Sequence, residues 1–239
     1  KKGNFYQNTG EGGLTDYHIE GGGDITWQIG TGYFGCRDLH GNFNPEKFSE
    51  KANLPNVKMI EIKLSQGAKP GHGGVLPAAK NTEQIARIRG VEPHTMILSP
   101  PSHSAFSDAK GLVHFIKQLR ELSNGKPIGF KLCIGNTAEF EAICNEMIAE
   151  DCYPDFITVD GAEGGTGAAP LEFSDGVGMP FAPALIFVNK TLVSLNIRDK
   201  IRVIGSGKII SGFSILHAIA LGADMCNSAR GFMFSLGCI

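Results

Sequence analysis

The sequence predicts an α/β protein of the (β/α)8 TIM-barrel class, and three observations lead to this prediction. In the second half of the chain, short apolar segments alternate with segments of helical period, and the connections are too short for an antiparallel return. Glycines and polar residues follow each predicted strand, where barrels place their catalytic loops. The chain has 239 residues, the size of one such barrel. An open doubly wound sheet is the alternative.

The predicted elements follow from these patterns. Predicted strands cover residues 25–29, 59–64, 95–98, 128–133, 156–159, 202–204 and 223–227, and predicted helices cover residues 81–89, 108–123, 137–149, 182–195 and 211–221. Asn81 is expected to cap the first helix. We expect a glycine-rich loop at residues 7–13 and no regular element at residues 37–56.

The strand count is one short of a closed barrel. The seven predicted strands compare with the eight that a barrel needs. We therefore expect residues 1–239 to form a single barrel domain that lacks its first β/α unit and is truncated at both ends.

Composition excludes several classes of protein. The formal net charge of −2 argues against a nucleic-acid-binding surface. The six cysteines contain no C-x-x-C pair, which is typical of free thiols in a reducing compartment, so we expect a cytoplasmic protein. No segment is apolar for long enough to span a bilayer, and residues 1–5 do not form a signal peptide.

The stretch at residues 155–170 organises the chain. A short apolar strand runs into Asp160, and four glycines then fall within seven residues, at positions 161, 164, 165 and 167. Glycine-rich strand ends of this kind let the backbone approach a ligand closely. We interpret the stretch as a binding edge, with an ordinary surface loop as the alternative.

Two late loops indicate a phosphate site. Barrels often bind phosphate in the loops after strands seven and eight, and here those loops contain Gly205, Ser206 and Gly207, and then Ser228, Ala229 and Arg230. The first loop offers backbone amides and the arginine offers a planar fork for phosphate oxygens. A glycine turn beside a surface arginine is the alternative.

Five motifs in order carry a family resemblance. They lie at residues 8–13 (Asn-Thr-Gly-Glu-Gly-Gly), 66–77, 97–101, 164–168 (Gly-Gly-Thr-Gly-Ala) and 236–238 (Leu-Gly-Cys). The chain resembles the FMN-binding domain of glutamate synthase, and most closely the stand-alone FMN-binding members of that family. The resemblance implies a barrel that holds FMN beside an iron–sulfur cluster and reduces 2-iminoglutarate, made from 2-oxoglutarate and ammonia, to L-glutamate. It also implies an electron donor, either a protein or an NAD(P)H-dependent subunit.

The chain departs from the family's pattern at the ligands of the iron–sulfur cluster. In the family, Leu-Gly-Cys begins a run of three cysteine ligands to a 3Fe–4S cluster, whereas here Cys238 is followed by one residue. We therefore expect Cys238 to be a metal ligand in the complete parent protein and no complete cluster in this chain.

The resemblance and the residue chemistry together suggest a site. We expect Gly164, Gly165 and Thr166 to bind the cofactor in the organising loop. Lys131 is the candidate cation beside flavin N1 and O2, where negative charge gathers on reduction. The alternative for Lys131 is a lysine whose stem lies in the core with its head at a rim.

Other residues are candidates for the substrate and its protons. Gln66 and Lys69 are expected to bind the keto acid, and Lys69 is also a catalytic candidate; Lys63 is the less favoured alternative. We expect the following proline to present the Lys69 side chain outward. Glu11 and Glu163 are the candidates for proton transfer to the imine nitrogen, with a loop-stabilising carboxylate as the alternative for each.

Two other functions stay open. The chain could be a flavin-holding electron-transfer or regulatory subunit without a substrate of its own. It could also be a flavin-free phosphate-binding barrel lyase or isomerase, for which the late loops alone would suffice. Flavin absorbance separates the last function from the other two.

Overall fold

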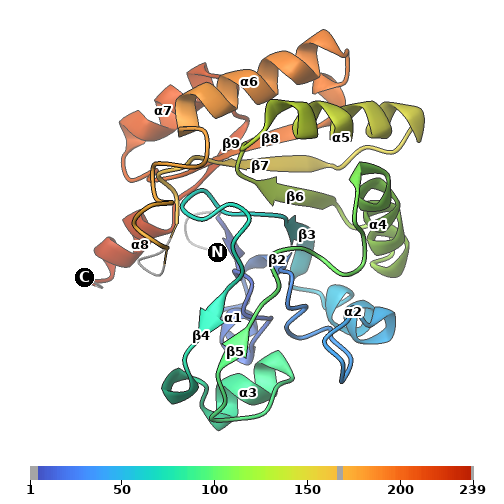
Figure 1. Ribbon diagram of the computed structural model, residues 1–239, viewed down its shortest axis with the longest axis vertical. Coiled ribbons are helices and arrows are strands. Elements are labelled where there is room, and N and C mark those ends of the chain that lie inside the picture. The colour runs from blue at the N-terminus through green and yellow to red at the C-terminus, as the bar shows by residue number, and fades with distance from the viewer. Residues whose placement is uncertain (1–4, 166–168, 238–239) are drawn as a thin grey trace. The chain divides into compact units, whose positions relative to one another are not determined.

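The structure, a computed structural model, describes residues 5–165 and 169–237. The chain forms two compact units (Figure 1). Unit 1 comprises residues 1–64 and 71–129, and unit 2 comprises residues 65–70 and 130–239. The expectation of a single barrel domain stays a prediction.

Unit 1 contains a parallel sheet in which β2 (Asp24–Ile29) pairs with both β1 (Tyr6–Asn8) and β3 (Val57–Lys63). The helices of this unit are α1 (Asp16–Glu20), α2 (Pro45–Ala52), α3 (Glu83–Arg89) and α4 (Ala109–Leu122). Strand β2 is buried from Ile25 to Ile29, as expected for a strand covered on both faces. Its Trp27 ring stacks on Phe48 of α2 at a centroid distance of 5.4 Å.

Unit 2 contains β7 (Phe156–Asp160), β8 (Arg202–Ser206) and β9 (Met225–Asn227), which pair in parallel in that order. Its helices are α5 (Thr137–Ala149), α6 (Phe181–Ser194), α7 (Gly212–Ala220) and the short α8 (Arg230–Ser235). Helices α5, α6 and α7 lie together on one side of these strands (Figure 1). Strand β6 (Ile128–Leu132) begins in unit 1 and ends in unit 2. Parallel strands that alternate with helices confirm the predicted α/β class.

Helix starts follow their capping residues. Asn136 accepts a hydrogen bond from the Ala138 amide at the start of α5, and Asp108 accepts one from Gly111 at the start of α4. The expected cap at Asn81 is wrong, because Thr82 accepts from Ile85 and α3 begins at Glu83. Asn81 instead lies buried and donates to the carbonyls of Glu92 and Thr95.

Three further expectations for unit 1 are wrong. The strand predicted at residues 95–98 is β5 (Ile97–Leu98), which pairs antiparallel with β4 (Val75–Leu76) outside the parallel sheet. Residues 7–13 are not all loop, because β1 runs from Tyr6 to Asn8. Residues 37–56 contain α2, which buries only Phe48 and Ala52 and therefore shows little periodicity. The one-turn helices η1 (Ala78–Lys80) and η2 (Arg198–Lys200) were not predicted either.

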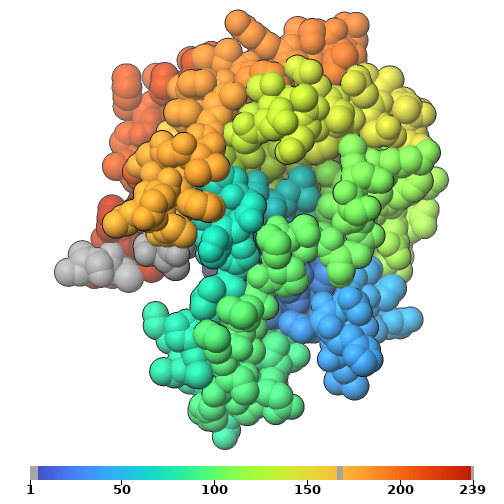
Figure 2. All heavy atoms as spheres, viewed as in Figure 1, coloured from blue at the N-terminus to red at the C-terminus, as the bar shows by residue number. Residues whose placement is uncertain are grey.

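The outer surface of unit 2 is made by helices. In the space-filling view, the side chains of α5 and α6 form a continuous surface (Figure 2). Phe140 and Met147 of α5 and Leu185 of α6 are buried beneath it. Among residues 5–165 and 169–237, no helix is both long and apolar enough to cross a membrane.

Candidate functional site

The carboxyl end of β7 carries a buried carboxylate, Asp160, whose side chain contacts two other segments. Asp160 is 2% exposed to solvent. The Lys131 Nζ lies 3.2 Å from Asp160 Oδ2, and the Gly67 amide donates to the same oxygen at 2.9 Å. A carboxylate buried this deeply needs such partners to offset its lost hydration. The head of Lys131 is thus held in an ion pair at the strand ends.

The loop at residues 65–70 packs directly on the glycines that follow β7. The Ala68 amide donates to the Gly164 carbonyl at 2.5 Å, and the Ser65 hydroxyl accepts a hydrogen bond from the Cys133 amide. A Cβ on Gly67 would lie 1.6 Å from the Gly161 carbonyl oxygen. Glycine is therefore required at position 67 by the close approach of two backbones.

Both proposed substrate residues lie in this loop. Gln66 is 9% exposed and Lys69 is 8% exposed. The expectation that Pro70 presents Lys69 outward is therefore wrong, because the loop turns back onto residues 161–165 and buries the lysine. The structure nevertheless brings Gln66, Lys69 and Lys131 into one compact unit.

The two late loops lie side by side. Ser206 is in register with Asn227 across β8 and β9, and the Ser228 hydroxyl donates to the Ile209 carbonyl at 2.7 Å. Within residues 5–165 and 169–237, no protein group accepts a hydrogen bond from the amides of Gly207, Ser228 and Arg230. Such unused amides suit an anion with several oxygens.

Arg230 and the glycines complete this cradle. The Arg230 side chain is exposed, and its Nη2 makes a long contact of 3.4 Å with the Gly165 carbonyl. Gly207 has a φ of +128°, which side chains rarely adopt, and Gly205 packs against the Phe181 ring. The late loops, with Gly164 and Gly165 beside them, fit the phosphate of a bound nucleotide cofactor.

Glu163 has a structural contact. The Phe181 amide, at the start of α6, lies 3.1 and 3.0 Å from its two carboxylate oxygens. The carboxylate thus accepts a hydrogen bond from one of the amides that have no partner within the helix. Its negative charge also interacts favourably with the positive end of the helix dipole. This is the loop-stabilising alternative that the sequence analysis left open.

Glu11 lies in unit 1, within a group of cations. Its Oε2 is 3.1 Å from the Lys63 Nζ at the end of β3, and it packs against Gly30. Arg89, whose guanidinium lies over the Phe34 ring, has a pKa lowered by burial and raised in part by Glu11. Glu11 is thus held among cations of unit 1.

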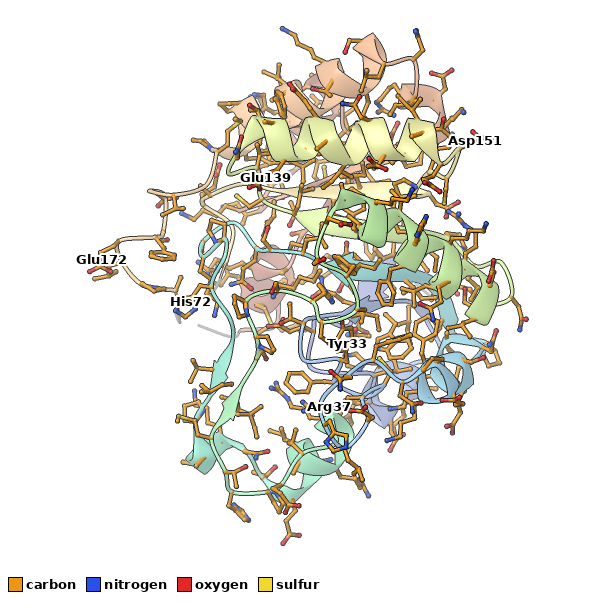
Figure 3. The ribbon with its side chains drawn as sticks, turned by 45° about the vertical axis from the view of Figure 1, so that its right-hand side comes forward. Tyr33, Arg37, His72, Glu139, Asp151 and Glu172 are labelled. Carbon is orange, nitrogen blue, oxygen red and sulfur yellow. The ribbon has the colours of Figure 1, made fainter. Side chains whose placement is uncertain are left out.

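Lys63 is positioned by a buried pair of side chains. His103 Nε2 lies 2.9 Å from the Lys63 carbonyl, and its Nδ1 lies 3.0 Å from the Tyr33 hydroxyl. A carbonyl only accepts, so Nε2 carries the proton and the Tyr33 hydroxyl donates to Nδ1. The hydroxyl in turn accepts from the Ala105 amide. Figure 3 shows Tyr33 directed into the side-chain interior, whereas Asp151 and Glu172 point outward.

The buried imidazole predicts a pH dependence of stability. Burial lowers the pKa of His103 from 6.5 to about 4. Between these values the unfolded chain takes up a proton that the folded chain does not, so the free energy of unfolding falls as the pH decreases from about 6.5 to about 4, by up to about 3 kcal/mol. Urea unfolding of the wild type and His103→Gln across this range measures it. His103→Gln should remove the part of the stability loss that is due to this imidazole. Identical pH profiles for the wild type and His103→Gln would contradict the assignment. His18→Gln, at a less buried site, is the control.

Two predicted site residues lie outside the described residues, namely Thr166 and Cys238. Within residues 5–165 and 169–237, no three or more His, Cys, Asp or Glu side chains form a group that could hold a metal ion. The residues in these two ranges therefore form no complete ligand set for an iron–sulfur cluster.

Asp160 was not among the predicted site residues, and neither was Arg89, which lies near Glu11 in unit 1. Asp160 had a signal, because it is the acidic residue at the end of the organising strand. Arg89 had none, since only the fold brings its guanidinium beside Gly12 and the Phe34 ring.

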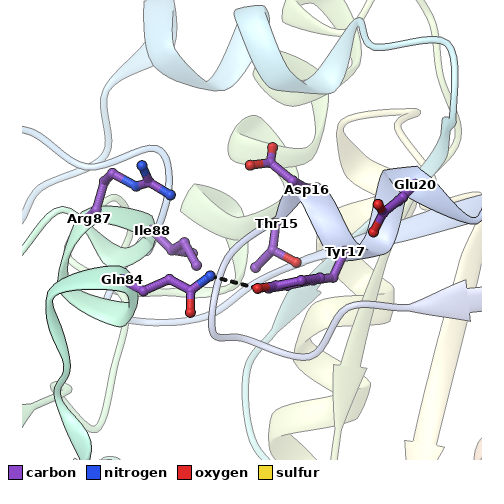
Figure 4. Close-up of a pocket in the computed structure, with 7 residues that line it drawn as sticks. All are labelled: Thr15, Asp16, Tyr17, Glu20, Gln84, Arg87 and Ile88. Carbon is purple, nitrogen blue, oxygen red and sulfur yellow. Dashed lines mark hydrogen bonds between the residues drawn. The ribbon is translucent and has the colours of Figure 1, made fainter.

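A shallow hollow of about 270 Å³ lies elsewhere in unit 1, between α1 and α3 (Figure 4). Gln84 donates to the Tyr17 hydroxyl at 2.9 Å across it. Its lining residues are Thr15, Asp16, Tyr17, Glu20, Gln84, Arg87 and Ile88. None of these is a predicted site residue.

Comparison with known proteins gives one consistent result. A profile described as the conserved region in glutamate synthase matches residues 2–239. The chain is 44% identical over 237 residues to the glutamate synthase large subunit-like protein YerD of Bacillus subtilis (strain 168), which covers 99% of this chain and 45% of that protein. It is 34% identical over 234 residues to the archaeal glutamate synthase (NADPH) of Methanocaldococcus jannaschii, which covers 98% of this chain and 42% of that protein. The chain thus spans less than half the length of these relatives.

Solved structures give the same fold. A double mutant of flavocytochrome b2 with pyruvate bound matches with a TM-score of 0.58 at 16% identity, over 98% of this chain and 50% of that one. A mutant with benzoylformate matches with a TM-score of 0.59 at 16% identity, over the same shares. These structures are (β/α)8 barrels, so the likeness confirms the predicted fold class.

Proposed function

The chain belongs to the glutamate synthase family, and on this premise we propose that it is an FMN-dependent oxidoreductase domain that reduces 2-iminoglutarate to L-glutamate. The iminoglutarate forms from 2-oxoglutarate and ammonia. One observation carries the proposal: unit 2 contains a half-buried cation at Lys131, an anion cradle in the late loops, and a lysine-bearing loop at residues 65–70.

The fit to FMN is supported by this chain's own atoms. The unused amides of Gly207, Ser228 and Arg230 and the exposed guanidinium of Arg230 suit the phosphate. Lys131 suits the pyrimidine edge of the ring, where negative charge gathers on reduction. When bound, the flavin supplies the hydride that reduces the imine carbon.

The protein residues have separate tasks in this proposal. Lys69 and Gln66 bind the carboxylates and carbonyl of the keto acid, because an ammonium and an amide offer five donors between them. The burial of both side chains excludes water from that contact. Proton transfer to the imine nitrogen stays a prediction for Glu11 and Glu163, and the contact of both Glu163 oxygens with the Phe181 amide favours a structural role for that carboxylate.

Flavin binding and glutamate formation test the proposal together. The purified chain, loaded with FMN and reduced by dithionite without oxygen, should form close to one equivalent of L-glutamate on addition of 2-oxoglutarate and ammonium. Arg230→Ala should weaken FMN binding by roughly 1.5–3 kcal/mol, the range for a charged hydrogen bond. Lys208→Ala, at an exposed lysine near the same loop, is the control.

The outcomes distinguish the three functions. No FMN binding would contradict the proposal and favour a flavin-free barrel. FMN binding without glutamate formation would favour an electron-transfer subunit that needs a partner for its chemistry.

A further inference from the structure

Asp160 is the point where the cofactor and substrate segments of unit 2 meet. Its Oδ2 lies 3.2 Å from the Lys131 Nζ and accepts a hydrogen bond from the Gly67 amide at 2.9 Å. Its Oδ1 faces Gly164, where an added Cβ would lie 2.5 Å away. One carboxylate therefore touches the proposed flavin cation, the substrate loop and the glycine loop.

We propose that Asp160 is a positioning residue that sets both the charge beside the flavin and the place of the substrate loop. This rests on the proposed function, because it takes Lys131 as the flavin cation and residues 65–70 as the substrate loop. The two effects come from two different properties of the side chain, its negative charge and its hydrogen-bond acceptor.

The charge acts through Lys131. An ammonium beside a buried carboxylate forms a nearly neutral pair, so its field at the flavin is weaker than that of a lone cation. Without the negative charge, Lys131 should stabilise the anionic reduced flavin more strongly. Asp160 thus keeps the flavin a stronger reductant than Lys131 alone would allow.

The acceptor acts through Gly67. The amide of Gly67 has its hydrogen bond to Asp160 Oδ2, and Gln66 and Lys69 lie on either side of it in the chain. If that bond is lost, the turn that buries both side chains loses one of the hydrogen bonds that anchor it, another being the Ala68–Gly164 bond. Asparagine at position 160 retains an acceptor and lacks the charge, whereas alanine lacks both.

The first experiment measures flavin affinity in the two redox states. In Asp160→Asn, the ratio of the affinity for reduced FMN to the affinity for oxidised FMN should rise roughly tenfold. This equals a rise of about 30 mV in the reduction potential of a two-electron couple. Lys131→Met should shift this ratio in the opposite direction, because it removes the positive charge and leaves the carboxylate. No shift in Asp160→Asn, or a shift in the same direction in Lys131→Met, would overturn the charge half of the proposal.

The second experiment needs no flavin. Hydrogen exchange of the Gly67 amide in the FMN-free chain should become at least tenfold faster in Asp160→Ala and stay near the wild-type rate in Asp160→Asn. The keto-acid KM should rise about tenfold in Asp160→Ala alone. Unchanged exchange in Asp160→Ala would overturn the acceptor half. Because exchange is measured without FMN, a failure of flavin binding would count against the proposed function only. The exchange rates would still test the acceptor half of the proposal.

Asp224 provides a matched control. Its Oδ2 is likewise shared by a cation and an amide, at 2.9 Å from Arg198 Nη2 and 2.7 Å from the Val203 amide. It lies by the amino end of β8, away from the loops that follow the strands. Asp224→Asn should lower stability and leave both the flavin affinity ratio and the exchange of Gly67 unchanged; a shift of either would overturn the assignment to Asp160.

Discussion

Gly67→Ala is expected to lower the free energy of unfolding by about 3–5 kcal/mol, a large effect for the addition of one methyl group. The new Cβ would lie 1.6 Å from the Gly161 carbonyl oxygen and 2.7 Å from that of Gly164. Both neighbours are backbone atoms, which cannot rotate away as a side chain can. The loop at residues 65–70 would therefore have to move.

The expected magnitude has two parts. Moving the loop breaks the bonds from Gly67 to Asp160 and from Ala68 to Gly164, each with a net contribution of about 1 kcal/mol. Overpacking adds about 1–3 kcal/mol. Urea unfolding followed by circular dichroism measures the sum.

Gly135→Ala is the matched control. Gly135 lies in the same unit, has nothing within 4 Å of an added Cβ and has an ordinary φ. Its substitution should change stability by no more than about 0.5 kcal/mol. If Gly67→Ala unfolds at the same urea concentration as Gly135→Ala, the close packing of the two loops is refuted.

The sequence predicted most regular elements of unit 2, although not η2 or α8, because their signals are local. Helix α5 begins and ends at the predicted residues, since Asn136 caps it and apolar residues recur at helical spacing. Strand β7 extends one residue beyond its prediction, to Asp160. Each pattern needs only the residues within the element.

Unit 1 was harder because its elements are short or depend on distant partners. Strand β1 spans three residues and is defined by pairing with β2. The segment 95–98 has the composition of a barrel strand, yet β5 pairs with β4 instead. Propensity indicates that a segment can be a strand, and only tertiary pairing decides which sheet it joins.

The same distinction holds for the site. The glycine loops and the candidate ligands could be selected from the sequence, because glycine at a strand end has a specific backbone use. Their pairing could not be selected. Asp160 and Gly67 are 93 positions apart in the chain. No local sequence pattern indicates that this carboxylate accepts a hydrogen bond from the Gly67 amide and also pairs with Lys131.

Lys69→Met is expected to raise the KM for the keto acid by roughly 10- to 150-fold, equivalent to about 1.5–3 kcal/mol of lost transition-state stabilisation. A buried ammonium pairs strongly with a carboxylate, because little water competes for it. Lys69 is 8% exposed in the loop at residues 65–70, and the methionine keeps much of its apolar stem. The affinity for FMN should change little, since the late loops that we propose bind its phosphate are untouched.

Two quantities measured on one variant decide the role of Lys69. Steady-state kinetics gives the KM, and thermal unfolding gives the Tm. Lys190→Met, at an exposed position of α6, is the control and should change neither. Lys69→Arg should restore part of the affinity, because it keeps the charge but not the compact ammonium. A lower Tm with an unchanged KM would show that Lys69 closes its loop rather than binding the substrate.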